Sequence, residues 1–204
     1  MECPMSRVPR GVLAIALLVP ALLLGQHSGG GSAPRPQSVA PAEAEQFAFL
    51  IGQWEVKVTP KVSGIAARIH GSPSYVGTWK AWRAFDRFGI EDELRIMDRS
   101  GNPNNLTHTL RFYDAAQRKW ALTALDVYRG RYSTAVAELK GSEMTVTSAG
   151  RDAEGKPYVQ RARFYDITPT GFKFNADRSI DGERTWDMGV LKIEARRVAA
   201  IAPR

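Results

Sequence analysis

The fold is decided by stretches such as residues 132–148, YSTAVAELKGSEMTVTS, in which two strand-like segments flank a tight turn. The segments Tyr132–Leu139 and Met144–Ser148 carry aromatic and β-branched residues, and the Lys140-Gly141-Ser142 sequence between them is a turn signal. A connection this short joins antiparallel neighbours, because parallel strands need a long crossover segment. The stretch therefore predicts a β-hairpin.

The same pattern of short strands and turns continues in both directions along the chain, with no long helix. Closing such a meander on itself removes its exposed edges. The sequence therefore predicts an all-β fold, a single antiparallel up-and-down β-barrel of about 8 to 10 strands, preceded by a short helical turn over Glu43–Leu50. The strand-like segments are Trp54–Thr59, Tyr75–Phe85, Ile90–Met97, Leu106–Tyr113, Trp120–Tyr128, Tyr132–Leu139, Met144–Ser148, Tyr158–Ile167, Phe172–Arg178 and Trp186–Val198.

The N-terminal residues have the organisation of an export signal. Arg7 and Arg10 precede an apolar run over Val12–Leu24, which is short for a membrane span. We expect residues 1–25 to be a signal peptide, with an uncleaved membrane anchor as the alternative. Residues 26–42 are a Gly/Ser/Pro-rich linker, and residues 43–199 are the barrel domain. The expected location is periplasmic or extracellular, and membrane contact is expected only through an uncleaved N-terminal segment.

The charge and the cysteine content bear on nucleic-acid binding and on disulfide bonds. The chain of 204 residues has 28 Lys and Arg against 21 Asp and Glu, a formal net charge of +7, and the basic residues are scattered rather than clustered. A diffuse excess does not indicate a specific nucleic-acid site. The single cysteine, Cys3, lies before the apolar run, so no disulfide is expected in the barrel domain. The oligomeric state is left open.

The start of the first strand carries a family resemblance. Gly52-Gln53-Trp54, within residues 49–55, resembles the opening of calycin-type barrels, the superfamily of lipocalins, fatty-acid-binding proteins and nitrobindin-like proteins. More narrowly, the chain resembles bacterial secreted lipocalin-like proteins of unknown function. The resemblance implies that an arginine of the last strand packs across Trp54. Arg197 is that arginine if Leu191, Ile193 and Ala195 face inward, which makes Gly52, Trp54 and Arg197 the structural signature.

His108 is the candidate for chemistry inside the barrel. Strand alternation groups it with Leu106, Leu110 and Phe112, which predicts that it faces the interior. There it would be a hydrogen-bonded core residue, a ligand of haem iron or another metal, or a proton carrier. The nitrobindin-like resemblance implies a haem-dependent isomerase, but that group uses a histidine near the end of the barrel and none follows His108 here. We therefore expect no haem, no other cofactor and no metal cluster.

Aromatic residues either line a ligand pocket or fill the barrel. Trp79, Trp120 and Phe174, with His108, are the candidate lining residues. Asp126, Tyr128 and Arg178 would orient a ligand through polar contacts, or lie exposed on the surface. The leading hypothesis is a non-enzymatic barrel that binds a small hydrophobic or amphipathic molecule. The alternatives are the haem enzyme and a filled envelope barrel that acts by binding a partner.

One turn has a motif of its own. Residues 179–186, SIDGERTW, are similar to the Asp-box hairpin of sialidase propellers, but a propeller needs several copies. A single copy predicts a tight turn at Asp181-Gly182 in which Thr185 makes a hydrogen bond.

Overall fold

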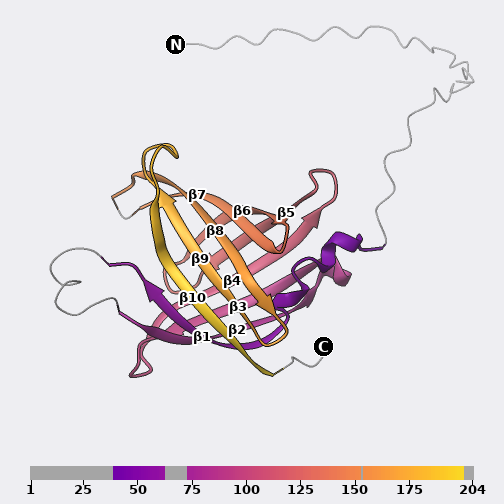
Figure 1. The fold of residues 1–204 in the computed structure, drawn as a ribbon, viewed down its shortest axis with the longest axis horizontal. Helices are drawn as coiled ribbons and strands as arrows, with labels where there is room; N and C mark the ends of the chain where they lie inside the picture. Colours follow the sequence, from indigo (N-terminus) through magenta and orange to yellow (C-terminus); the bar gives the residue numbers. More distant parts are fainter. Residues whose placement is uncertain (1–38, 63–72, 153, 200–204) are drawn as a thin grey trace, which may run out of the picture. The chain divides into compact units, whose positions relative to one another are not determined.

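The computed structural model describes residues 39–62, 73–152 and 154–199, which lie in the compact unit Gln37–Arg204. Ten strands form a closed antiparallel barrel in which each strand pairs with its sequence neighbours and β10 closes onto β1 (Figure 1). The predicted fold class is therefore confirmed. The strands are β1 (Gly52–Pro60), β2 (Tyr75–Ala84), β3 (Gly89–Met97), β4 (Pro103–Asp114), β5 (Lys119–Asp126), β6 (Arg131–Lys140), β7 (Glu143–Arg151), β8 (Pro157–Thr168), β9 (Gly171–Ser179) and β10 (Asp187–Ala199).

In the described ranges, the helical content consists of three 3-10 turns. Two of them, η1 (Ala42–Glu45) and η2 (Ala48–Leu50), stand where the sequence predicts a helical turn, and η3 (Phe85–Arg87) joins β2 to β3. Within the described part of the chain, no helix is long and apolar enough to cross a membrane. The expected signal peptide and most of the expected linker lie outside the described residues.

The pairing of β1 with β10 shows which of their side chains share the inner face of the barrel. Trp54, Val56 and Val58 alternate with exposed residues along β1, and they pair with Arg197, Ala195 and Ile193 of β10. Because strand side chains alternate between the two faces, this register places both sets on the inner face.

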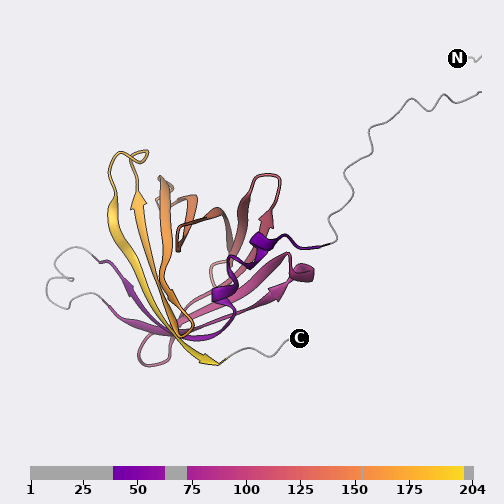
Figure 2. The same cartoon turned by 45° about the vertical axis from the view of Figure 1, so that its right-hand side comes forward.

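The turns η1 and η2 close one end of the barrel, which we call the plugged end. They lie between the yellow-orange and the magenta strands (Figure 2), and Phe47 contacts Trp120 of β5 and Phe164 of β8. Two indole nitrogens hold the turns in place, since Trp54 Nε1 donates to the Leu50 carbonyl at 2.7 Å and Trp120 Nε1 donates to Gln46 Oε1 at 3.0 Å.

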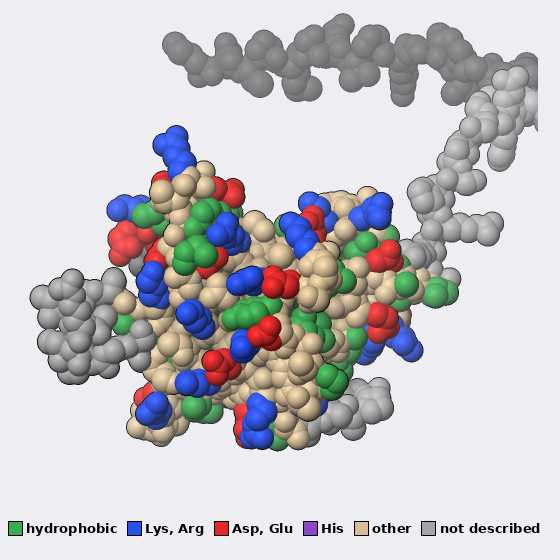
Figure 3. Space-filling model, viewed as in Figure 1, with side chains coloured by type: hydrophobic (Ala, Val, Ile, Leu, Met, Phe, Trp, Pro, Cys, Tyr) green, Lys and Arg blue, Asp and Glu red, His purple; other side chains and the backbone are tan. Residues whose placement is uncertain are grey.

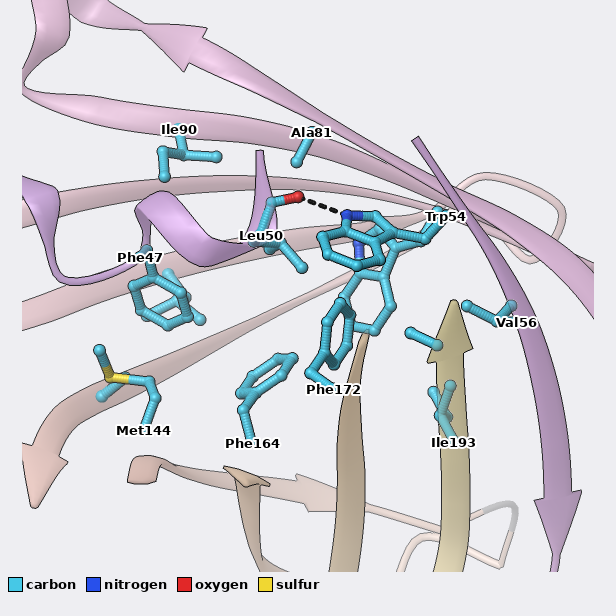
Figure 4. Packing of buried hydrophobic residues seen from close by; sticks show 14 of the residues in the cluster. Phe47, Leu50, Trp54, Val56, Ala81, Ile90, Met144, Phe164, Phe172 and Ile193 are labelled. Atoms are coloured by element: carbon cyan, nitrogen blue, oxygen red, sulfur yellow. Dashed lines mark hydrogen bonds between the residues drawn. The ribbon is translucent and has the colours of Figure 1, made fainter. Parts of the chain in front are cut away.

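The hydrophobic core gathers at the plugged end. Phe47, Leu50, Trp54 and Phe164 are almost completely buried, and Phe172 packs edge-on to Trp54 with ring centroids 4.9 Å apart (Figure 4). Burial of each such side chain contributes roughly 1.5 to 3 kcal/mol. The aromatic side chains therefore fill this half of the barrel and stabilise it.

Candidate functional site

The inward side chains change character along the barrel axis. Towards the plugged end they are large and aromatic, whereas towards the opposite end of β5–β8 they are small or polar. We call this opposite end, where the β5–β6 and β7–β8 turns lie, the cavity end. The inward residues there are Ala124, Asp126, Arg131, Ser133, Ser148, Gly150, Tyr158 and Gln160.

A cavity of about 460 Å³ lies at the cavity end. This volume is within the range of roughly 300 to 1,000 Å³ that is usual for small-molecule sites. Its lining combines apolar, hydroxyl and charged groups from β4 to β8. The lining residues are Thr107, Ala124, Asp126, Arg131, Tyr132, Ser133, Thr134, Ala149, Gly150, Arg151 and Tyr158.

The cavity opens where β6 and β7 separate. Their register runs from the Lys140–Glu143 pair to the Ala135–Ser148 pair and ends there. Residues 131–134 of β6 and 149–151 of β7 then flank the opening and contribute to the cavity lining. Strand edges that no longer pair with each other present backbone donors and acceptors. The opening therefore offers polar groups to a ligand in addition to the side chains.

Tyr158 forms a fixed wall of the cavity. A Cβ atom built on Gly150 would lie 2.6 Å from both Cζ and Oη of Tyr158, so the ring rests directly on the Gly150 backbone. Arg178 covers Tyr158, with its guanidinium carbon 4.3 Å from the ring centroid. Because the ring lies between these two residues, the position of its hydroxyl is set by packing.

Charged groups are concentrated at the rim of the cavity. Asp126 accepts a hydrogen bond from Arg129 Nη1 at 3.0 Å, and Arg131 Nη2 lies 4.0 Å from the same carboxylate. Arg151 donates to the Gly155 carbonyl at 2.8 Å, a neutral acceptor that leaves its charge uncompensated. The rim therefore carries more positive than negative charge.

Two other hollows lie on the outside of the barrel, one larger and one smaller than the cavity. One of about 620 Å³ is bordered by outward side chains of β10, β1, β2 and β3, among them Glu55, Lys57, Val76 and Arg196. Another of about 200 Å³ lies over β7–β9. Both are bordered largely by outward side chains, so the cavity end is the stronger candidate site.

The aromatic residues expected to line a pocket pack instead in the core. Trp79 and Trp120 are 4% and 0% exposed, and Trp79 lies 6.5 Å from Phe174 between ring centroids. None of the three borders the cavity. These three residues therefore do not line this cavity, because the large rings at the plugged end fill the interior there.

The expectation that His108 faces the interior is also wrong. On β4 the inward residues are Thr109 and Arg111, which are 6% and 4% exposed, while Leu110 and Phe112 are exposed on the outer face. His108 lies with this outer set, 4.0 Å from Glu91 Oε2. An apolar outer face and a polar inner face reverse the pattern on which the prediction depended.

The described interior holds no histidine that could bind haem iron. His108 is outside the barrel, and His27 and His70 lie beyond the described ranges, so the described interior offers no imidazole as an iron ligand. Within those same ranges no group of three or more His, Cys, Asp or Glu side chains is placed to hold a metal ion.

Of the residues expected to orient a ligand, Asp126 lines the cavity and Arg178 supports Tyr158 behind it. Tyr128 lies exposed in the β5–β6 turn and does not reach the lining. Sequence reasoning missed Arg131, Ser133 and Tyr158. The run of small residues at alternate positions of β6, which includes Ser133 and Ala135, was the available signal that this part of the interior is not filled.

The signature residues lie together at the plugged end. Arg197 Cζ is 4.0 Å from the centroid of the Trp54 ring, which is the arrangement that the calycin resemblance implies. Gly52 opens β1 with φ of 132°, a backbone conformation that favours glycine.

The fold and its cavity define a class, a closed ten-strand antiparallel barrel with one plugged end. A scan against protein-family models finds no match, and a search of curated proteins also finds none. Among solved structures, the chain is similar to the S-type phycobiliprotein lyase CPES from Guillardia theta, with a TM-score of 0.51 and 10% identity. The similarity covers 77% of this chain and 93% of that chain, and at this identity it shows the fold alone.

Proposed function

We propose that this protein binds a small amphipathic molecule in the cavity at the cavity end of the barrel. The observation that carries the proposal is the 460 Å³ space inside the wall of β4–β8, where Ala124 offers an apolar surface and Ser133, Thr107 and Tyr158 offer hydroxyl groups. The lining therefore presents apolar and polar groups together, as an amphipathic ligand requires.

The structural neighbour supports the same class of function. It is named as a phycobiliprotein lyase, so a barrel of similar fold is found in a protein with that activity. The fold alone does not transfer that activity. Binding is proposed here without a catalytic step, because the cavity lining has no nucleophile paired with a base.

A cavity-filling variant tests the proposal. Ala124→Phe places a ring in the cavity, whereas Thr123→Phe adds the same ring on the outer face of β5. The neutral fluorescent probe phenylnaphthylamine should bind the full chain and the Thr123→Phe variant, and should lose affinity at least tenfold in the Ala124→Phe variant. Equal binding by all three proteins would refute the cavity as the site. Native mass spectrometry of protein purified from its own source would identify a retained ligand.

We also propose that the protein is exported, as a secreted lipocalin-like barrel. The apolar run over Val12–Leu24 behind Arg7 and Arg10 supports this proposal. The test is the intact mass of the protein from a fractionated culture. A mature chain that starts after residue 25 supports export with cleavage, and a full-length chain in the membrane fraction supports the anchor. A full-length chain in the cytoplasmic fraction refutes export.

A further inference from the structure

We propose that the cavity selects anionic ligands, and that Arg131 and Arg151 hold a carboxylate or sulfonate group at the opening between β6 and β7. This inference rests on the proposed function, since it names the chemical class of ligand for the same site.

The two arginines reach the cavity from opposite sides of one opening. Arg131 begins β6 and Arg151 ends β7, and both residues line the cavity. The β6–β7 register has already ended at the Ala135–Ser148 pair, so the opening lies between them. An anion that enters there meets a cation on each side, and guanidinium groups bind carboxylate and sulfonate oxygens through paired N–H donors.

The negative charge at the opening is already engaged. Asp126 is the one carboxylate among the residues that line the cavity. It accepts hydrogen bonds from the Arg129 backbone N–H at 3.3 Å and from Arg129 Nη1 at 3.0 Å, and it forms a longer ion pair with Arg131 Nη2 at 4.0 Å. Asp152, next to Arg151, accepts instead from the backbone N–H groups of Glu154 and Lys156 in its turn.

Arg151 lacks the carboxylate partner that several other strand arginines have. Arg196 pairs with Glu55 at 2.6 Å and Arg161 pairs with Asp177 at 3.2 Å, and Figure 3 shows blue and red side chains interspersed over β8–β10. In the described part of the chain, no carboxylate lies within 4.0 Å of Arg151. Its charge is therefore available to a ligand.

Arg178 adds to the positive potential behind the cavity wall. Its Nε atom is buried without a hydrogen-bond partner among the described residues, and its Nη2 is 3.5 Å from Gln160 Oε1. A half-buried cation near the cavity attracts an anion more strongly than a fully exposed cation does.

Two matched probes test the charge preference. Anilinonaphthalene sulfonate and phenylnaphthylamine share one aromatic body, and only the first carries a negative charge. The full chain should bind the sulfonate more tightly, and added salt should reduce that advantage. The Arg131→Gln/Arg151→Gln double variant should lose about tenfold in affinity for the sulfonate, which is the scale of one charge-assisted contact, and should keep its affinity for phenylnaphthylamine.

Controls separate the two proposals. Arg196→Gln removes an outer-face arginine and should change neither affinity, and thermal unfolding should show that each variant is folded. If both probes bind the cavity equally and the double variant leaves sulfonate binding unchanged, the anion preference is refuted and the binding function stands. If neither probe responds to Ala124→Phe, the binding function itself fails.

Discussion

Arg197 lies across Trp54 at the plugged end, with its guanidinium carbon 4.0 Å from the centroid of the indole ring. The same guanidinium donates from Nε to the Pro169 carbonyl at 2.6 Å and from Nη1 to the Ile51 carbonyl at 2.9 Å. Pro169 lies in the β8–β9 turn and Ile51 directly before β1. One side chain of β10 therefore joins three separate parts of the chain and covers a buried ring.

Replacing Arg197 should destabilise the barrel strongly. Lysine has a single compact ammonium group, which cannot bond both carbonyls and also cover the indole. We expect Arg197→Lys to lower the free energy of unfolding by about 2 to 3 kcal/mol, the scale of hydrogen bonds to a charged group. Urea unfolding followed by tryptophan fluorescence would measure this change.

The adjacent residue provides the control. Arg196 points outward and forms an exposed ion pair with Glu55. Pairs of this kind contribute about 1 kcal/mol or less, so Arg196→Lys should have little effect. If both variants cost the same, the bridging role of Arg197 is contradicted.

A second prediction concerns the charged pair in the core. Arg111 Nε donates to Asp92 Oδ2 at 2.5 Å, Trp79 Nε1 donates to Asp92 Oδ1 at 2.7 Å, and both side chains of the pair are at most 5% exposed. Asp92→Ala would leave the Arg111 charge buried without its partner, which should cost about 3 to 5 kcal/mol.

A double variant tests whether the ion pair as a whole contributes net stability. Asp92→Leu/Arg111→Met removes both charges and keeps much of the side-chain volume. It should therefore unfold at a higher urea concentration than Asp92→Leu or Arg111→Met alone. A double variant less stable than both singles would show that the ion pair itself contributes net stability.

The barrel topology was predictable because local signals repeat along the chain. Turn residues recur at short intervals, and Gly101, Gly141, Gly155 and Gly182 all adopt positive φ in the structure, as tight turns require. Short connections allow only antiparallel neighbours, and closure follows from the need to remove edges. These arguments need no knowledge of which strand face is buried.

The residues of β4 alone could not predict which of its two faces is buried. Leu110 and Phe112 are more apolar than Thr109 and Arg111, yet the second pair is the buried one. Arg111 is accommodated inside because Asp92 of β3 lies next to it, at a sequence separation of nineteen residues. The alternation of apolar and polar residues within one strand contains no information about a partner on another strand.

The cavity was only partly predictable for a related reason. Asp126 stood out as a polar residue in a strand, but its neighbours in the lining come from β6, β7 and β8. The end of the β6–β7 register at the Ala135–Ser148 pair creates the opening, and register depends on pairing across the whole barrel.

Acid stability should depend on the turn at Asp181. Its carboxylate accepts hydrogen bonds from the Thr185 hydroxyl at 2.6 Å, the Thr185 N–H at 3.0 Å and the Ser179 hydroxyl at 2.8 Å. These donors, the Thr185 hydroxyl first, lower the pKa of Asp181 from 3.8 to about 2.

A lowered pKa means that the folded state favours the charged carboxylate. The stabilisation that the charged Asp181 carboxylate provides is complete above the pKa that this group has in the unfolded chain. It is lost as the pH falls from about 4 towards 2. Asp181→Asn should therefore flatten the fall of stability in that window, and Thr185→Val should flatten it partly. Urea midpoints measured at several pH values would check this, and identical pH profiles for the three proteins would contradict it.

The last prediction concerns the wall of the cavity. The Cβ atom of Gly150→Ala would lie 2.6 Å from the Tyr158 ring, and Arg178 on the other side leaves the ring little room to move. We expect Gly150→Ala to cost about 1 to 3 kcal/mol of unfolding free energy, as overpacking does, and to weaken phenylnaphthylamine binding. In a Tyr158→Ala background the added methyl group meets no ring, so the same substitution should cost almost nothing. Equal costs in the two backgrounds would mean that Tyr158 does not rest on Gly150, and that its hydroxyl is not held in the cavity by packing.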